Sequence, residues 1–460
     1  MNSHNGIVPK AKGSLLFGNT LKVLKDPLAF LSELRDNYGA IVKVKLGTKS
    51  YYVVQQPEAS KYILQEHARN YYKPGAAKLF KLFLGEGLAT SNGDYWLKQR
   101  RALQPAFHKQ TIQALQTIIQ SETDQLVSRW KEFPDQYLVS IDQEFLRLTL
   151  SNITRSMFSL DIKQDMDKIT RLLNGLLSYA SKWTASFIKI DPRIPTPSNQ
   201  KFWRSRRQFD NIIYEIIRKR QEDRKNKNEI ERNDLLELLM KAAEDSGQTM
   251  TKEQLRDEIS TIFMAGHETT AQTLSWIFYH LAKYPIIYEK LAKEADQSLN
   301  ESTPNFPETR KVIEETLRLY PPVWVMARKS LQADTISGYY LPKGSTVLIN
   351  VYGMHRNSKF WNHADQFDPE HFNSTNALTA PPFSYLPFGG GQRLCIGNHF
   401  AMMVMQTVIS SLVREFEFVV PEGFQPIPNP TITLRAKNGI ALQIKKRVKP
   451  ITPKHAAANS

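Results

Sequence analysis

Apolar residues recur every three to four positions along most of the chain, which is the pattern of helices that bury one face. This period predicts helices over residues 96–107, 111–131, 141–160, 164–181, 198–224, 233–245, 251–283, 287–299, 308–320 and 398–416. Strand patterns occur only near the two ends. We therefore expect a mainly α protein with small β-sheet regions.

Two segments alternate between apolar and polar residues, as half-buried strands do. Residues 38–57 are rich in Val, Ile and Tyr, with residues 47–49 as the turn of a predicted hairpin. Residues 431–447 place Asn438 and Gly439 between two alternating runs, which is the strongest short-range signal for a hairpin. The sequence thus predicts one hairpin near each end of the chain.

The predicted helix over residues 251–283 is the longest, and about 33 residues give a rod of roughly 50 Å. It begins with a capping box at Thr251. Its middle carries Gly266, which costs about 1 kcal/mol relative to alanine. Glu268 and Thr269 follow directly, and a carboxylate is an unusual choice for a buried helix. We infer that these unusual residues in the middle of the helix serve a function.

Composition excludes several classes of protein. The 460 residues include one cysteine, Cys395, so the chain forms no internal disulfide. One cysteine is also too few for an iron–sulfur cluster or a zinc finger. The net charge of +16 permits nucleic acid, an anionic membrane or an acidic protein as partner, and charge alone does not choose among them.

No window approaches the ~20 apolar residues of a membrane span, so we expect a cytoplasmic protein without a transmembrane anchor. No linker, repeat or low-complexity block divides the chain. We predict one domain over residues 1–451 and a disordered tail over 452–460.

The stretch FGGGQRLCIG, residues 388–397, surrounds Cys395 with four glycines and Arg393. A free cysteine is usually a buried, inert thiol. Here the glycines let the backbone bend sharply and approach a flat object closely, and a helix is predicted to begin near Asn398. The helix N-terminus and the nearby cation favour the thiolate, which is a nucleophile or a metal ligand.

The nucleophile interpretation needs a histidine base, and no histidine is recognisably paired with Cys395. The ligand interpretation needs a metal whose other positions are filled by something besides cysteine. Haem brings four nitrogens of its own, takes one axial protein ligand and carries two propionates that call for Arg and Trp donors. A haem site accounts for the whole set of residues.

Two spaced pairs fit such a site, although each has a simpler interpretation. Glu315 and Arg318, three residues apart on a predicted helix, would usually be a solvated ion pair. Trp96 and Arg100 share one face of a short basic helix. They are either a surface cation–π pair or two donors that converge on an anion.

At this point the sequence resembles the cytochrome P-450 family over nearly its whole length. The family's signature Phe-x-x-Gly-x-Arg-x-Cys-x-Gly is matched at Phe388, Gly391, Arg393, Cys395 and Gly397. The motifs Glu-x-x-Arg and Ala/Gly-Gly-x-Asp/Glu-Thr are matched at Glu315, Arg318, Ala265, Gly266, Glu268 and Thr269. His371 stands where many relatives have arginine, so its cluster with Glu315 and Arg318 is expected to be weaker or pH-dependent.

The resemblance implies a cytochrome P-450 fold that holds haem b between the long helix and the cysteine loop. The residues implied to bind haem are Trp96, Arg100, Ala265, Gly266, Arg328, Phe388, Gly389, Arg393, Cys395 and Gly397. Cys395 is implied to be the axial ligand, with Glu268 and Thr269 relaying protons and Gly266 leaving room for dioxygen. Glu315, Arg318 and His371 are implied to be structural.

The implied activity is insertion of one oxygen atom from dioxygen into a lipophilic substrate. Fatty acids, terpenoids or carotenoids, and polyketides stay open as substrates. Apolar residues in the segments that face the haem in relatives predict a pocket lined by Phe83, Trp183, Phe187, Val323 and Trp324.

Electrons are implied to come from a separate ferredoxin or flavodoxin, because the chain has no flavin or ferredoxin module. Lys98, Arg101 and Lys109 are the predicted contact surface for this donor, unless they serve only solubility. No nucleic-acid partner is expected.

Three other functions stay open as alternatives. A haem-binding sensor or carrier would bind ligands without turnover, and a cysteine hydrolase would be colourless. A peroxide-driven enzyme of the same family would often lack the acid and threonine pair that Glu268 and Thr269 provide.

Overall fold

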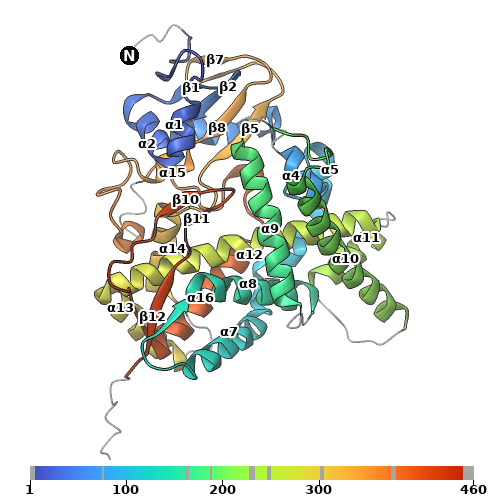
Figure 1. The fold of residues 1–460 in the computed structure, drawn as a ribbon, viewed down its shortest axis with the longest axis vertical. Helices are drawn as coiled ribbons and strands as arrows, with labels where there is room; N and C mark the ends of the chain where they lie inside the picture. The colour runs from blue at the N-terminus through green and yellow to red at the C-terminus, as the bar shows by residue number, and fades with distance from the viewer. Residues whose placement is uncertain are drawn as a thin grey trace, which may run out of the picture.

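A computed structural model describes residues 6–74, 77–160, 165–186, 189–226, 234–245, 250–300, 305–373 and 380–448. The predicted tail over 452–460 and the predicted pocket residue Phe187 lie outside these ranges. Helices fill most of the molecule, and the strands gather mainly at the end where the chain begins (Figure 1). The predicted mainly α class is confirmed.

The long helices have the following bounds: α2 (Pro27–Asn37), α4 (Ala77–Leu84), α5 (Gly93–Leu103), α7 (Gln116–Lys131), α8 (Ile141–Phe158), α9 (Met166–Ala185), α10 (Pro197–Lys225), α11 (Leu235–Asp245), α12 (Lys252–Lys283), α13 (Pro285–Gln297), α14 (Pro307–Leu319) and α16 (Asn398–Glu415). Four short α-helices are α1 (Thr20–Lys25), α3 (Pro57–Lys61), α6 (Lys109–Gln113) and α15 (Val351–His355). Single turns of other helix types are η1 (Tyr62–Glu66), η2 (Ala68–Asn70), η3 (Gln104–Phe107), η4 (Ser298–Asn300), η5 (Pro369–Phe372) and η6 (Gly391–Arg393).

The predicted helices are confirmed, with ends that differ by a few residues. The segment 111–131 is divided between α6 and α7, and 96–107 continues from α5 into η3. The capping box of α12 is present, because Thr251 Oγ1 accepts from Gln254 N–H and Gln254 Oε1 accepts from Thr251 N–H.

The strands are β1 (Ile41–Leu46), β2 (Lys49–Val54), β3 (Tyr71–Tyr72), β4 (Tyr137–Ser140), β5 (Met326–Ser330), β6 (Asp334–Ile336), β7 (Tyr339–Leu341), β8 (Thr346–Ile349), β9 (Phe416–Val419), β10 (Pro428–Pro430), β11 (Leu434–Ala436) and β12 (Ala441–Lys446). They form a five-stranded sheet in the order β1-β2-β8-β5-β3, a three-stranded sheet β4-β12-β9, and the pairs β6-β7 and β10-β11. The first predicted hairpin is confirmed, since β1 and β2 pair antiparallel from Ile41↔Val54 to Leu46↔Lys49.

The second predicted hairpin is wrong. Gly439 does adopt the left-handed turn conformation, with φ of 74°. However, β11 pairs with β10, and β12 pairs with β4 and β9. The start of α8 draws the chain away from β11, because Ile141 N–H donates to Ile440 O at 2.9 Å. The predicted turn at Gly439 is present, but the predicted pairing of the two strands that flank it, β11 and β12, is not.

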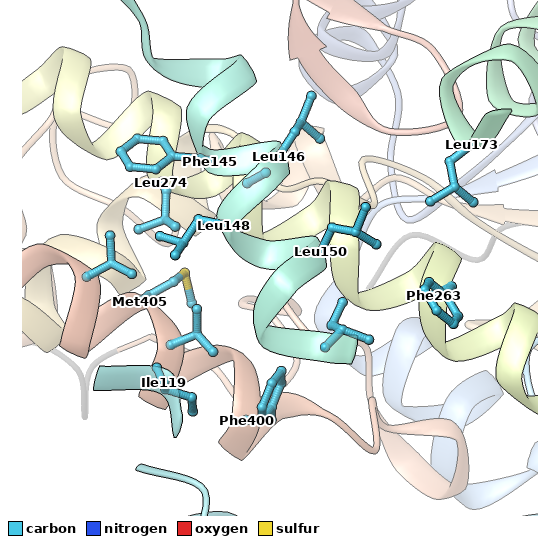
Figure 2. Packing of buried hydrophobic residues seen from close by; sticks show 14 of the residues in the cluster. Ile119, Phe145, Leu146, Leu148, Leu150, Leu173, Phe263, Leu274, Phe400 and Met405 are labelled. Carbon is cyan, nitrogen blue, oxygen red and sulfur yellow. The ribbon is translucent and has the colours of Figure 1, made fainter. Parts of the chain in front are cut away.

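The largest apolar core joins α7, α8, α12 and α16. Figure 2 shows Phe145 and Leu148 of α8 among Leu274 of α12 and Met405 of α16. All four side chains are buried, and α12 has a buried residue at nearly every position from Thr270 to Leu281. The helix that carries the predicted oxygen-activating residues is therefore held rigidly along its second half.

Candidate active site

Cys395 lies in a tight loop directly before α16. The Cys395 N–H donates to Phe388 O at 2.9 Å, and the Leu394 N–H donates to Gly391 O at 3.1 Å. Gly391 has φ of 64°, and a Cβ at this position would collide with the carbonyl oxygen of Leu64. Only glycine fits there, so the sequence of the loop fixes where the sulfur lies.

The side chain of Cys395 is exposed, although protein atoms surround it on its remaining sides. This desolvation raises the pKa of the thiol, and the Gly397 N–H, Arg100 and Lys73 oppose the rise only in part. The backbone at the start of α16 and the nearby cations favour the thiolate, as expected from the sequence, but desolvation outweighs them. A metal ion bound to the sulfur would supply the missing stabilisation of the thiolate.

Helix α5 holds the loop from one side. The guanidinium carbon of Arg393 lies 3.9 Å from the centre of the Trp96 ring, so the predicted tryptophan is buried under an arginine of the cysteine loop rather than under Arg100. Arg100 Nη1 donates to Leu394 O at 2.9 Å. Trp96, Arg100 and Arg393 are thus brought together beside Cys395, as the resemblance implied.

Two further cations complete a group of four around this loop. Arg328 on β5 is buried, and burial lowers its pKa to about 10. Lys73 lies close enough to Arg328 and Arg393 that burial and these two charges lower its pKa to about 7. Within the described residues, none of Lys73, Arg100, Arg328 and Arg393 forms an ion pair with a carboxylate. Arg328 is buried and the other three are partly buried, and cations grouped in this way call for an anionic ligand.

Lys73 was missed by sequence reasoning. It follows the two-residue strand β3, and its Nζ donates to Ala89 O at 2.8 Å. Its backbone N–H donates to Asn92 Oδ1 at 3.0 Å, and Arg393 Nη2 donates to the same oxygen at 3.1 Å. No local pattern marks a lysine for this role, because the group forms only when β3, β5, α5 and the cysteine loop meet.

The donor set fits a metal that brings its own ligands. Among the residues that the structure describes, no cluster of three or more His, Cys, Asp and Glu side chains could hold a metal ion. One accessible sulfur beside four cations that have no acidic partner among the described residues fits haem, which takes one protein ligand and carries two carboxylates.

The middle of α12 supplies the other predicted site residues. Ala265 is exposed although most of α12 is buried, so protein atoms leave room beside it. Thr269 Oγ1 donates to Ala265 O at 2.7 Å. Burial raises the pKa of Glu268, whose Oε1 lies 3.9 Å from Arg435 Nη1. A Cβ at Gly266 would lie 2.9 Å from Ile153 Cδ1, so a larger residue here would have to displace the end of this α8 side chain.

Glu315 and Arg318 form a buried pair, not the surface pair of the simpler interpretation. Both side chains have no exposed surface, and Arg318 Nε and Nη2 donate to the two Glu315 oxygens at 2.7 and 2.8 Å. His371 Nδ1 lies 3.2 Å from Glu315 Oε1, and its Nε2 lies 2.6 Å from Asn362 O. Since both ring nitrogens of His371 face acceptors, the imidazolium form fits this site.

The charge on His371 makes the stability of this cluster depend on pH. Burial opposes the charge, but the hydrogen bond to Glu315 and its negative charge outweigh burial, and the pKa of His371 is raised. A raised pKa contributes stability that is complete below the unfolded value of about 6.5 and is lost as pH rises through the folded value.

We expect the free energy of unfolding to fall by about 1–2 kcal/mol as pH rises above ~6.5, owing to this one group. His371→Arg places a permanent charge there and should flatten this part of the profile. Urea unfolding at a series of pH values measures both proteins. Parallel profiles for the two proteins would contradict the assignment.

The predicted substrate-pocket residues lie in different environments. Phe83 is completely buried and packs against Phe80 and Phe202, so it offers no surface to a ligand. Trp324 packs on the apolar cluster of β1 and β2, and its indole N–H donates to Thr431 O at 3.0 Å. Trp183 N–H donates to Ile190 O at 2.8 Å. Val323 is 44% exposed and is the most exposed of the four members that the structure describes.

Comparison with known proteins defines the class. Residues 8–445 match the family described as cytochrome P-450, and the chain belongs to this family. It is therefore a haem-thiolate monooxygenase, which uses dioxygen, takes electrons from a redox partner and acts on lipophilic substrates. Within the described residues, no helix is both long enough and apolar enough to cross a membrane.

Three relatives show the range of the similarity. Protein LUTEIN DEFICIENT 5, chloroplastic, of Arabidopsis thaliana is 30% identical over 96% of this chain and 78% of its own length. Cyclooctatin synthase of Streptomyces melanosporofaciens is 30% identical over 93% of both chains. Pentalenene oxygenase of Streptomyces avermitilis is 25% identical over 97% of this chain and 99% of its own length.

Proposed function

We propose that this chain hydroxylates or epoxidises a terpenoid or carotenoid substrate, with haem b ligated by Cys395. The observation that carries the cofactor assignment is the accessible sulfur of Cys395 among four cations that, in the part of the chain the structure describes, have no acidic partner. The substrate class is supported by the names of relatives, which refer to lutein, cyclooctatin and pentalenene.

The chain's own residues would act in three ways. Cys395 would bind the haem iron through its sulfur, and Lys73, Arg100, Arg328 and Arg393 would hold the two propionates, with the Trp96 N–H as a further donor. The haem, when bound, supplies the chemistry that activates dioxygen and oxygenates the substrate.

The remaining roles belong to α12. Burial raises the pKa of the Glu268 carboxyl, which would relay protons at its Oε atoms, and the Thr269 hydroxyl would pass them onward. The room beside Ala265 would admit the substrate carbon that reacts. The retention of both the acid and the threonine favours dioxygen over a peroxide as oxidant.

Two measurements test this proposal. The reduced protein with carbon monoxide should show the strongly red-shifted absorption of a sulfur-ligated haem. A panel of terpenoids, carotenoids, fatty acids and polyketides should then shift the Soret band, with terpenoids or carotenoids giving oxygenated product when NADPH and a ferredoxin system are added. Spectral shifts without product would instead indicate a sensor or carrier, and a colourless protein would remove the proposal.

Lys73 gives a separate test of the propionate assignment. Lys73→Met should release haem to apomyoglobin at least about tenfold faster than the wild-type protein, because a charge-assisted hydrogen bond in a buried site is lost. The red-shifted carbonyl band should persist, since the sulfur is untouched. Lys98→Met removes an exposed lysine of α5 and serves as the control. Equal release rates for the two variants would exclude Lys73 from the haem site.

The proposed surface for an acidic ferredoxin or flavodoxin lies on α5 and α6. Lys98, Arg101 and Lys109 are exposed, and their neighbour Arg100 contacts the cysteine loop. Charge reversal of Lys98 and Arg101 should slow the first electron transfer about tenfold or more at low salt, and salt should reduce the difference. Charge reversal of the exposed Lys343 and Lys359 changes the net charge equally and should leave the rate nearly unchanged.

A further inference from the structure

Asn92 stands directly before α5, in the position where an asparagine side chain usually accepts a hydrogen bond from the first turn of a helix. Its backbone is extended, with φ of −138° and ψ of 170°, as that of helix-capping residues is. Within the part of the chain that the structure describes, its side chain nevertheless makes no such bond to α5. By contrast, the side chains of Thr196 and Thr251 do cap α10 and α12. The Asn92 side chain is therefore available for another contact.

The start of α5 explains why this cap is missing. Gly93, the first residue of α5, has φ of 62°, which lies in the left-handed region and not in the helical one. A Cβ at Gly93 would meet no described atom within 4 Å, so the backbone angle and not crowding favours glycine there. The chain thus enters α5 through an irregular first turn, which the side chain of Asn92 does not cap.

The Asn92 side chain instead contacts two of the four cationic residues beside Cys395. Its Oδ1 accepts from the Lys73 backbone N–H at 3.0 Å and from Arg393 Nη2 at 3.1 Å. Its Nδ2 donates to Lys73 O at 3.3 Å, and Ser91 O accepts from Arg393 Nη1 at 3.0 Å. One amide thus links two cationic residues that lie far apart in the sequence.

These contacts fix the direction of the Arg393 guanidinium. The group is planar and holds its five N–H donors in a rigid fork. Residues 91 and 92 bind one donor on each Nη atom, and the face of the group packs on the Trp96 ring, whose centre lies 3.9 Å from the guanidinium carbon. The remaining donors of Arg393 therefore point in a set direction.

The segment that carries Asn92 is in turn fastened to α12. The Glu86 N–H donates to Asp257 Oδ2 at 2.8 Å, and the Leu88 N–H donates to Glu258 Oε2 at 3.0 Å. A Cβ at Gly87 would lie 2.6 Å from Asp257 O, so only glycine lets the two backbones approach this closely. The position of Asn92 is therefore set by contacts to the long helix as well as by its own neighbours.

We propose that Asn92 is a positioning residue of the haem site, which orients Arg393 toward a propionate and holds the backbone of Lys73 beside it. The inference rests on the proposed function and adds a residue that does not itself bind the haem. Residues that orient ligand-binding groups reduce the ordering that remains to be done when the ligand binds, and so strengthen binding. The competing role is purely structural, in which Asn92 only holds the start of α5 against β3.

The first test uses the full haem-loaded chain and the variant Asn92→Ser. Serine is a good helix cap but is too short to contact Arg393 and Lys73 together. Asn92→Ser should release haem to apomyoglobin at least about fivefold faster than the wild-type protein, because a hydrogen bond to a charged group is lost. The propionate bending bands of its resonance Raman spectrum should shift, while the red-shifted carbonyl band persists. A wild-type release rate with unshifted propionate bands would overturn the proposal.

Asp94→Ala is the matched control for a weaker α5. Asp94 is the exposed acidic residue in the first turn of α5, and its removal weakens the start of the helix without changing the Asn92 amide. Haem release should stay within about twofold of the wild-type rate, because the effect of one exposed charge at a helix start is small. Equal acceleration in Asp94→Ala and Asn92→Ser would assign Asn92 to the stability of α5 and would overturn the proposal.

A double-mutant cycle tests whether Asn92 acts through Arg393. Arg393→Lys keeps the charge but lacks the guanidinium donor that binds the Asn92 oxygen. In this background Asn92→Ser should change haem release by less than about twofold, because the two substitutions remove the same contact. An undiminished effect of Asn92→Ser in the Arg393→Lys protein would overturn the proposal.

The same release rates distinguish failure of this inference from failure of the proposed haem site. If Lys73→Met and Arg393→Lys released haem faster but Asn92→Ser did not, the cations would still hold the propionates and the role of Asn92 would be wrong. If none of the three variants released haem faster, the propionate assignment would be wrong and the role of Asn92 would fall with it.

Discussion

Cys395→Ala is expected to abolish the red-shifted carbonyl absorption of the reduced protein and to lower oxygenation by at least about a thousandfold, the scale of losing an essential catalytic group. No other residue can replace the sulfur anion, because Cys395 is the only cysteine of the chain. The fold should persist, since the Cys395 backbone N–H keeps its bond to Phe388 O.

Cys395→Ala also distinguishes the role of the sulfur as ligand from the role of the four cations proposed to hold the propionates. Lys73, Arg100, Arg328 and Arg393 remain in Cys395→Ala, so the protein should still take up haem, with an altered spectrum and faster release. Lys73→Met should also release haem faster, but its carbonyl band should be normal, so the spectrum distinguishes the two variants. Leu394→Ala in the same loop keeps the sulfur and serves as the control, since Leu394 accepts from Arg100 only through its backbone oxygen. A red-shifted band in Cys395→Ala would exclude Cys395 as the ligand.

Local patterns predicted the helices well, because the signals that form a helix lie within a few residues of one another. The capping box at Thr251 and the apolar period after it located α12 to within one residue at its start. The prediction of the C-terminal hairpin was wrong because the partners of a strand can lie far away in the sequence. Asn438 and Gly439 specify a turn, but β12 pairs with β9 and with β4, which lies about 300 residues earlier in the chain.

The same distinction between local signals and contacts of distant segments applies to the site around Cys395. The spacing of Arg393 and Cys395 lies within one loop, and a resemblance in sequence identified both. Lys73 reaches them only through the meeting of β3, β5 and the loop, so no local pattern indicates it. The direction of the Cys395 pKa also depends on burial, which is a tertiary property. The helix start and nearby cations lower this pKa as the sequence indicated, but the larger effect of desolvation has no local signal.

Glu315→Gln is expected to lower the free energy of unfolding by about 3–5 kcal/mol, the cost of leaving a buried charge without its partner. Arg318 has no exposed surface, and all its N–H groups have acceptors. Besides Glu315, these are the carbonyl oxygens of His355, Ala364 and Gln366, at 2.7, 2.6 and 3.0 Å. Among the described residues Glu315 is the one carboxylate bound to Arg318, and neutral glutamine removes its charge and turns one acceptor oxygen into a donor group.

The loss should reach the cysteine loop through His355. Burial lowers the pKa of His355 to about 3, so its ring is neutral. Its Nδ1 lies 3.2 Å from Arg318 O, and its Nε2 accepts from Leu386 N–H at 2.8 Å. Leu386 O in turn accepts from Gly389 N–H at 3.1 Å, at the start of the cysteine loop. Glu315→Gln should therefore lower haem occupancy as well as the urea midpoint.

Glu314→Gln provides the matched control for this prediction. The Glu314 carboxylate pairs with Arg310 at 3.0 Å on the same helix, but the Arg310 side chain is 65% exposed. Solvent screens such a pair, and its loss should change stability by less than about 1 kcal/mol. Urea unfolding and haem content, measured on both variants, decide the question. If the two variants lost equal stability, the buried cluster would not be what holds α14 to the cysteine loop.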